Sequence, residues 1–528
     1  MNIKTYKKMR NSNLFIILIM CAGIAAACSE NFLSTQPLTE VTEETFFRTQ
    51  EDMEMALVGA YNSMIRTTNT VALNPTRWDD IAHPGMGLDG INQRVMQTFD
   101  LTISNESNLY NGDWENAYTA IYRVNKLLQK LDEAEFEWDN PQRRNQIEAE
   151  ARFIRAHSYY NLVRYFERVV LITEPTDENL PQSDPDATYS LIADDLLFSA
   201  ENAPSEITSR GKVTNWAAKS LIARVYLFYT GYYEQPDLVG KVTEAQALQG
   251  LEDVIASGHF ELVPEFKNLW VAPSAEIVGD DLDLSSYAGK DNSEVILAHR
   301  HNMEINNPMV TGISNRVKPY PPYGFGWGGL TVKPEFYNSF EENDPRREAS
   351  IFALVEEGYG DEIDISFQRD YTGYKTKKYI TLATPDGTDY VTTQGGSWQN
   401  GQHWDYVYMR YADVLLMAAE LGSSNAQQYF DMVRDRVGLP SIPATFDNIM
   451  NERNFEFAFE GLRYFDLMRQ GLDVLAETLA YEGTVLDGGS EYHLVIDPQN
   501  IIEKRGFQQI PQEQLNISGG VLEQNPGW

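Results

Sequence analysis

One stretch of the chain concentrates aromatic side chains between prolines and glycines. Residues 320–329 read YPPYGFGWGG, which places Tyr320, Tyr323 and Trp327 within eight positions. Sugars present apolar C–H faces and rings of hydroxyl groups, so carbohydrate sites pair aromatic rings with planar polar side chains. Proline stiffens such a loop and glycine lets its backbone turn. The pattern predicts an aromatic platform; the alternative is a loop whose rings pack back onto the helices.

Two further clusters combine tryptophan with polar residues. Trp78, Asp79 and Asp80 are consecutive, and either carboxylate could accept hydrogen bonds from sugar hydroxyls while the indole stacks. The alternative, favoured because tryptophan is usually buried, is a core side chain with carboxylates that cap helices. Trp398 follows a Gly-Gly pair and is expected to be exposed, whereas Trp404 is expected to pack where the next helix begins.

Patterns for catalysis or metal binding are weaker. Asp79 and Asp80 are adjacent and diverge in direction, which makes them a poor acid and nucleophile pair for glycoside hydrolysis. His299 and His301 would point to one side of a strand, but no clear third ligand accompanies them, so a packing role is favoured. We predict no catalytic residues, no cofactor and no metal site. Two acidic turns, at residues 279–283 and 361–364, could hold structural calcium, but neither follows the spacing of an EF-hand loop.

The elements that must position these clusters are mostly helical. Apolar residues recur at spacings of three and four, which is typical of amphipathic helices, many of them paired across short turns. Small residues such as Ala217, Ala218 and Ala223 allow close packing, so we expect tetratricopeptide-like helical hairpins. The expected helices cover residues 43–66, 114–131, 142–166, 189–201, 215–229, 244–255, 409–421, 426–437 and 449–469.

Several conspicuous side chains on these helices are expected to be structural. Four aromatic residues on helical faces should lie in the core: Trp114, Tyr122, Trp216 and Tyr226. Five charged residues near the C-terminus, spaced three or four apart, should form helix-face ion pairs that hold the last helices together: Arg453, Glu456, Glu460, Arg463 and Asp466.

The character of the chain changes between residues 260 and 402. Helical periodicity fades, Pro, Gly, Asn and aromatic residues dominate, and short strands are expected at residues 294–299 and 378–382. Binding residues commonly lie on such loops. The fold expected is mainly α, with a loop-rich insert carrying short strands. Its parts are a helical segment at 28–259, the insert at 260–402 and a helical segment at 403–528, integrated into one globular unit.

Composition narrows the classes of function. The 528 residues, 42% of them hydrophobic, are enough for a large core and rule out a disordered tail protein or a small disulfide scaffold. Acidic residues number 77 against 42 basic ones, a formal net charge of −35. Nucleic-acid binding is disfavoured, because the phosphate backbone would meet repulsion over most of this surface.

The first 27 residues have the pattern of a signal peptide. Four cationic residues precede an uncharged apolar run, which ends on three alanines and is too short for a comfortable transmembrane helix. The next residue is Cys28, and small residues followed by cysteine resemble the lipobox at which bacterial lipoproteins are cleaved and acylated. The alternative is an ordinary signal peptide and an incidental cysteine. Cys21, the only other cysteine, leaves with the signal, so Cys28 has no disulfide partner.

Several separate motifs resemble those of SusD/RagB-family proteins. They begin with Cys28 in CSENFL, followed by Gln36-Pro37, and continue with EARFIRAHSYYNLV at 150–163. Later pieces are MRYADVLLMAAE at 409–420, NERNFEFAFEGLRYFDL at 451–467 and the terminal QNPGW. Together they span nearly the whole mature chain in the order found in the family.

The resemblance implies a lipid-anchored protein on the outer face of the Bacteroidetes outer membrane. Such proteins act as lids on SusC-like, TonB-dependent barrel transporters, and capture oligosaccharides or, in some members, peptides for uptake without being enzymes. Ser29 and Glu30 look like the family's export tag. Two other functions stay open: a surface glycan-degrading hydrolase, and, with less support, a repeat-based interaction protein.

Overall fold

The computed structural model describes residues 46–104, 106–304, 307–312, 316 and 318–528. The chain divides into two units, Met1–Asp52 and Met53–Trp528, and the description below concerns the second unless stated. It is mainly helical, with 49% helix and 11% strand. The expected signal peptide and Cys28 lie outside the described residues.

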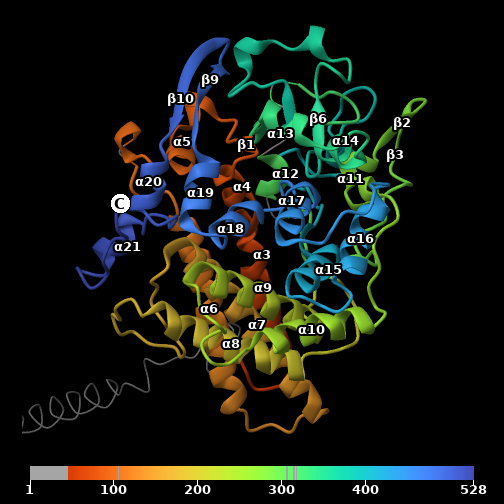
Figure 1. The fold of residues 1–528 in the computed structure, drawn as a ribbon. Helices are drawn as coiled ribbons and strands as arrows, with labels where there is room; N and C mark the ends of the chain where they lie inside the picture. The colour runs from red at the N-terminus through yellow and green to blue at the C-terminus, as the bar shows by residue number, and fades with distance from the viewer. Residues whose placement is uncertain (1–45, 105, 305–306, 313–315, 317) are drawn as a thin grey trace, which may run out of the picture. The chain divides into compact units, whose positions relative to one another are not determined.

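Five helices of the N-terminal half pack side by side in chain order. Helix α7 (Pro141–Phe166) contacts α6 (Asn111–Asp132) and α8 (Pro185–Asn202), while α9 (Asn215–Tyr233) contacts α8 and α10 (Glu244–Ala256). These helices occupy the lower part of Figure 1. The mainly α, tetratricopeptide-like fold predicted from the sequence is confirmed.

Side-chain caps fix where the helices begin. Thr243 and Gln246 form a capping box at α10, and the Asp184 side chain accepts a hydrogen bond from the Asp186 N–H at α8. Helix α3 (Gln50–Arg66) is shorter than expected, because residues 46–49 are bends and not helix. Within the first unit, Asp52 accepts a hydrogen bond from the Thr49 N–H at 2.9 Å, which supports a helix start at this point.

The C-terminal helices differ from the prediction at one point. Helices α15 (Tyr411–Glu420) and α16 (Ala426–Arg436) lie close to their expected bounds, but the single helix expected at 449–469 is two. Helix α17 (Phe446–Glu456) ends before a turn, and α18 (Arg463–Met468) follows it. At the turn Gly461 has φ +77°, and an added Cβ would lie 2.4 Å from the Val71 carbonyl oxygen. Close packing against that backbone therefore requires glycine and breaks the helix.

The strands form small sheets. A four-stranded sheet has the order β1-β5-β7-β6, and three antiparallel pairs are β4 with β8, β2 with β3 and β9 with β10. Their bounds are β1 (Ala82–His83), β2 (Glu276–Val278), β3 (Asp281–Asp283), β4 (Val295–His299), β5 (Thr331–Val332), β6 (Ile351–Ala353), β7 (Tyr374–Thr376), β8 (Tyr406–Arg410), β9 (Tyr481–Asp487) and β10 (Ser490–Ile496). The strand expected at 294–299 is confirmed as β4. The strand expected at 378–382 is wrong, because the chain turns there after β7.

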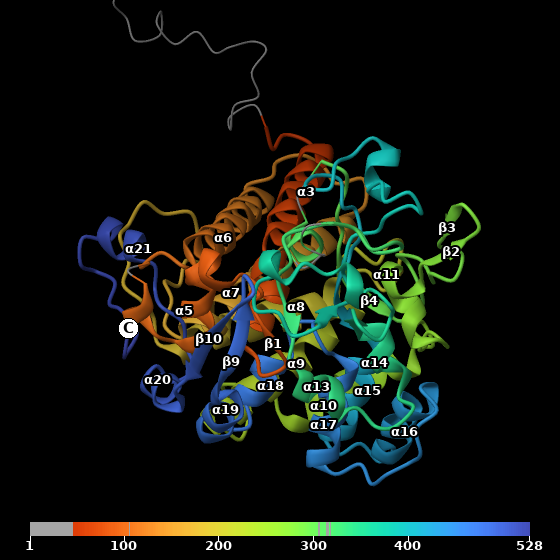
Figure 2. The same ribbon diagram turned by 90° about the horizontal axis from the view of Figure 1, so that it is seen from above.

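Short helices complete this unit. Viewed from above, β10 runs beside α5 (Figure 2), and α4 continues directly from a π-helical turn, η1 (Asn69–Leu73). The short helices are α4 (Asn74–Trp78), α5 (Ile91–Thr98), α11 (Val271–Ser274), α12 (Pro308–Thr311), α13 (Pro334–Ser339), α14 (Pro345–Ser350), α19 (Leu472–Leu479), α20 (Pro498–Glu503) and α21 (Gln512–Ile517).

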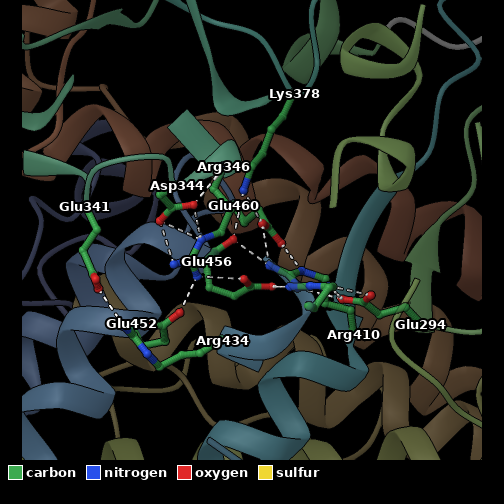
Figure 3. Close-up of polar contacts among 11 residues, drawn as sticks. Glu294, Glu341, Asp344, Arg346, Lys378, Arg410, Arg434, Glu452, Glu456 and Glu460 are labelled. Atoms are coloured by element: carbon green, nitrogen blue, oxygen red, sulfur yellow. Dashed lines mark hydrogen bonds and ion pairs between the residues drawn. The ribbon is translucent and has the colours of Figure 1, made fainter. Parts of the chain in front are cut away.

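A buried network of ion pairs joins the insert to the C-terminal helices (Figure 3). Arg346 on α14 contacts Glu452 on α17 at 2.5 Å, and Lys378 contacts Glu460 at 2.7 Å. Burial lowers the pKa of Lys378 to about 8, although Glu460 opposes that shift. These pairs tie the loop-rich insert to the scaffold at points far apart in the sequence.

Arg410, the last residue of β8, lies inside this network. Its guanidinium contacts Glu456 at 2.5 Å, Glu294 at 2.8 Å and Glu460 at 2.9 Å, and all four side chains are almost completely buried. Burial alone would raise the pKa of Glu456, but the surrounding guanidinium groups of Arg436, Arg410 and Arg346 hold it well below its usual value. The Glu456 carboxylate is therefore charged and depends on its arginine partners.

The five charged residues expected to hold the last helices together do so only in part, because Glu456, Glu460 and Arg463 pair with residues outside this set. Arg453 contacts Asp466 at 2.9 Å, whereas Arg463 binds Asp80, a residue near the start of the chain. The pairs connect different elements instead of neighbouring turns of one helix. Among the aromatic residues expected in the core, Trp114 and Tyr226 are buried and Trp216 is half-buried. The prediction for Tyr122 is wrong, because its side chain is 57% exposed.

Candidate ligand-binding site

Three aromatic rings from two loops of the insert meet at the surface. The Trp398 ring lies 4.8 Å from that of Phe325 and 5.3 Å from that of Trp327, at interplanar angles of 75° and 62°. Trp327 is 50% exposed, and the other two side chains are half-buried. We call Phe325, Trp327 and Trp398 the aromatic surface. Edge-to-face contacts of this kind fix each ring while leaving apolar faces accessible.

The loop that carries Trp327 is fastened at both ends. Before it, the Gly324 N–H donates to the Thr381 carbonyl at 2.7 Å; after it, the Leu330 N–H donates to the Pro84 carbonyl at 2.8 Å. The buried Lys375 ammonium on β7 donates to the Gly328 carbonyl at 2.8 Å. These bonds hold the backbone on either side of Trp327, so its indole is presented by a preorganised loop.

The segment that carries Trp398 is a compact turn. The Ser397 N–H donates to the Asn400 carbonyl at 2.6 Å, and the Gln402 side chain donates to the Trp398 carbonyl at 3.3 Å. Asn400, which follows Trp398 by two positions in the sequence, is exposed. Trp404 is half-buried, as expected of a packing residue, and stacks on Tyr390, but it precedes β8 and not a helix.

The prediction that Tyr320 and Tyr323 belong to an exposed aromatic platform is wrong. Their side chains are only 4% and 7% exposed. The Tyr323 ring packs 4.6 Å from Phe352 on β6, and the Tyr320 ring packs 5.2 Å from Tyr359. The rings turn inward because the adjacent sheet offers an apolar surface to cover. They support the loop and do not face a ligand.

The prediction that Trp78 stacks on a sugar is also wrong. Its side chain is 1% exposed, so the indole cannot be reached by a sugar. The indole is enclosed by aromatic rings of four residues from distant parts of the chain: Tyr110, Tyr165, Tyr464 and Phe465. The alternative given by the sequence, a core tryptophan with carboxylates that cap helices, is right for the buried indole but not for the carboxylates.

Asp79 and Asp80 also have structural partners. Asp79 is 2% exposed and accepts a hydrogen bond from the Ile81 N–H, and burial, then the charge of Asp80, raises its pKa well above the usual value. Asp80 binds Arg463 through two contacts of 2.8 and 2.9 Å. Neither carboxylate is presented to a ligand, which removes this pair as sugar-binding or hydrolytic residues.

These three residues still contribute to the site indirectly. The chain that follows them forms β1, which pairs with β5 directly after the aromatic loop, at Ala82 with Val332 and His83 with Thr331. An added Cβ on Gly85 would lie 2.6 Å from the Gly328 carbonyl oxygen. The backbone after Trp78 therefore forms the base on which the loop rests.

The two histidines of the β4 region are packing residues, as expected. His299 and His301 are buried, and Thr68 Oγ1 lies 2.9 Å from His299 Nδ1 and 3.2 Å from His301 Nε2. Burial lowers the pKa of both imidazoles, that of His301 to about 4. Among the residues that the structure describes, no group of three or more His, Cys, Asp or Glu side chains is placed to hold a metal ion.

Acidification is expected to weaken the fold through His157, which packs 5.4 Å from the His299 ring. Burial, then the charges of Arg164 and Arg224, lowers the pKa of His157 from 6.5 to about 3. Between these values the unfolded chain binds the proton and the folded protein does not, so the free energy of unfolding falls as the pH drops through this window.

The test is urea denaturation of the wild type and His157→Gln between about pH 4 and 6. The variant lacks one titrating group, so the slope of its unfolding free energy against pH should be lower by about 1.4 kcal/mol per pH unit. Equal slopes in the two proteins would show that His157 does not contribute.

A groove elsewhere on the protein has different chemistry. A groove of about 730 Å³ lies between α3, the start of α7 and the loop before α9, lined by Glu54, Arg143, Glu150, Glu201 and Lys212 among other polar residues. No aromatic ring lines it. Arg143 is bound to both Glu54 and Glu150 at 2.6 Å. Size alone would favour this groove for a ligand, but the aromatic surface has the chemistry that sugars require.

Membrane insertion by a helix has no support in the described part of the chain. Among those residues, no helix combines the length and the apolar character needed to span a bilayer.

Two family models match the chain in succession. One, described as starch-binding associating with outer membrane, matches residues 31–227, and the other, described as the SusD family, matches residues 293–528. Together the two matches cover most of the sequence, in the order that the separate motifs indicated. The chain belongs to the SusD family.

Individual relatives agree with this assignment. SusD-like protein P2 of Formosa agariphila is 26% identical, over 86% of this chain and 89% of its own. A solved laminarin-binding SusD-like protein is 27% identical, with a TM-score of 0.71 over 91% of this chain and all of its own. Surface glycan-binding protein A from Bacteroides thetaiotaomicron, solved with laminarihexaose, is 21% identical with a TM-score of 0.71 over the same shares, and shares the fold.

Proposed function

We propose that this protein captures a glycan at the cell surface through the aromatic surface of Phe325, Trp327 and Trp398. The observation that carries the proposal is an exposed indole on a loop held at both ends, next to a second, half-buried indole. Apolar sugar faces stack on such rings, and the exposed Asn400 side chain supplies a planar polar group for hydroxyls.

Laminarin is the first polysaccharide to test. The support is a relative, 27% identical over its full length, whose name describes laminarin binding. Glycan capture without cleavage also agrees with relatives that are named as binding proteins. We propose no catalytic residue, since the one carboxylate pair considered from the sequence is buried or bound to Arg463.

The cellular setting follows from the family and the N-terminal sequence. We propose that Cys28 carries the lipid that anchors the chain to the outer membrane, and that the protein acts as the lid of a SusC-like, TonB-dependent transporter. A family description that mentions association with the outer membrane supports the location. The motif of small residues before Cys28 supports the anchor.

The decisive experiment is a binding screen of the protein without residues 1–28 against polysaccharides and peptides, with product analysis of the same mixtures. Binding of a polysaccharide without new reducing ends is the expected result. New reducing ends would replace the proposal with a surface hydrolase. Binding of peptides alone would move the ligand class from glycan to peptide.

A further inference from the structure

A small cavity lies where the two helical halves of the Met53–Trp528 unit meet. Its volume is about 20 Å³, and helices α7, α9, α15 and α17 contribute to its wall. Four arginine side chains line it, each at least nine-tenths buried: Arg164, Arg224, Arg453 and Arg469. Buried guanidinium groups are costly unless each is paired with a negative charge, so the charges around this cavity have to balance.

Three of the four arginines are balanced by carboxylates. Asp413 and Asp466 each bridge two of these guanidinium groups, and Glu420 is a second partner of Arg469. The contacts, all between 2.6 and 3.0 Å, are Arg224–Asp413, Arg453–Asp413, Arg453–Asp466, Arg469–Asp466 and Arg469–Glu420. Three positive charges therefore meet three negative charges.

Arg164 is the fourth arginine, and its partners are neutral. Its guanidinium donates to the Asn161 side chain at 2.5 Å and to the Tyr160 carbonyl at 3.4 Å. It also lies 4.1 Å from the Tyr160 ring and 4.0 Å from the Phe465 ring. Within the described ranges no carboxylate forms an ion pair with it. One positive charge beside the cavity is in excess.

We propose that this cavity binds one halide-sized monovalent anion, with chloride as the natural occupant, held chiefly by Arg164. A cavity of about 20 Å³ has room for one particle the size of a water molecule. Sulfate, phosphate and carboxylates are larger. A single negative charge balances the single excess positive charge. The arginines also provide N–H donors, and these form stronger hydrogen bonds with an anion than with a water molecule.

The anion would connect helices from both halves of the chain. Arg164 is on α7, within the N-terminal helical row, whereas Arg453 is on α17, within the C-terminal helices. Because the anion binds the folded protein and not the unfolded chain, chloride at about 100 times its dissociation constant should raise the folding equilibrium constant about 100-fold.

Bromide tests the site directly, because it replaces chloride and scatters anomalously. Crystals of the wild-type protein grown or soaked in sodium bromide should show an anomalous peak in the cavity beside Arg164. In solution, sodium chloride should raise the melting temperature above that in sodium gluconate at equal concentration, since gluconate is too large to enter. No peak in the cavity would overturn the proposal, whatever the other salts do.

Arg164→Met should abolish the difference between chloride and gluconate, because it removes the excess charge. Arg168→Met is the matched control: this arginine lies two residues beyond the end of α7, is about half exposed, and pairs with Glu523 at 3.4 Å. The control should keep the full chloride effect. A chloride effect of wild-type size in a folded Arg164→Met variant would contradict the proposal, and if that variant does not fold, the bromide peak still decides.

Discussion

Replacing Trp327 by alanine is expected to weaken binding of the preferred polysaccharide by about 1–3 kcal/mol, which is about 5- to 150-fold in dissociation constant. The indole is half exposed on a fastened loop and packs against Trp398. Removing it takes away the largest apolar face of the aromatic surface and one support of the second ring. Trp398→Ala should have an effect of the same size, because either loss breaks the pair.

The measurement is isothermal titration calorimetry with the wild type and both variants. Phe446→Ala is the matched control, since Phe446 is a similarly exposed aromatic residue on α17, outside the aromatic surface. The control should bind like the wild type, and all variants should unfold at nearly the wild-type temperature. Unchanged affinity of a folded Trp327→Ala protein would exclude Trp327 from the site.

Replacing Arg410 by methionine should lower the free energy of unfolding by about 3–5 kcal/mol. The side chain contacts Glu294, Glu456 and Glu460, and all three carboxylates are almost completely buried. Methionine fills similar space but leaves these negative charges with fewer partners. The network also joins the insert to α17, so the insert should become more mobile.

Denaturant unfolding measures the first effect and amide hydrogen exchange of the insert measures the second. Lys241→Met is the control, because Lys241 pairs with Asp194 at the exposed surface. Such a pair contributes about 0.2–1 kcal/mol. If Arg410→Met cost no more than Lys241→Met, the network would not be a major source of stability.

Most helices could be predicted because their apolar spacing survives in a single sequence. The break between α17 and α18 could not, since it depends on Gly461 meeting the Val71 backbone, a contact between distant segments. The hairpin of β9 and β10 was missed although a local signal exists. Gly488 and Gly489 both have positive φ between paired Asp487 and Ser490, which is the pattern of a two-residue hairpin turn.

The candidate site was harder to predict than the fold. Trp78 and Trp327 both stand near polar or flexible residues, yet one is enclosed by four rings and the other is half exposed. Tyr122 has helical spacing that suggests burial, but nothing large covers it. The exposure of a side chain depends on which distant segments pack against it, and these contacts cannot be inferred from the local sequence pattern. The motif that contains Arg453, Glu456 and Glu460 was correctly interpreted as structural, because its charges have buried partners.

The structure of the protein bound to a fragment of its preferred polysaccharide tests the central claim most directly. We expect a sugar ring stacked on Trp327 or Trp398, with hydroxyl groups within hydrogen-bond distance of neighbouring polar side chains such as Asn400. A sugar bound in the polar groove beside Arg143, with both indoles uncovered, would contradict the assignment of the aromatic surface as the glycan-binding site.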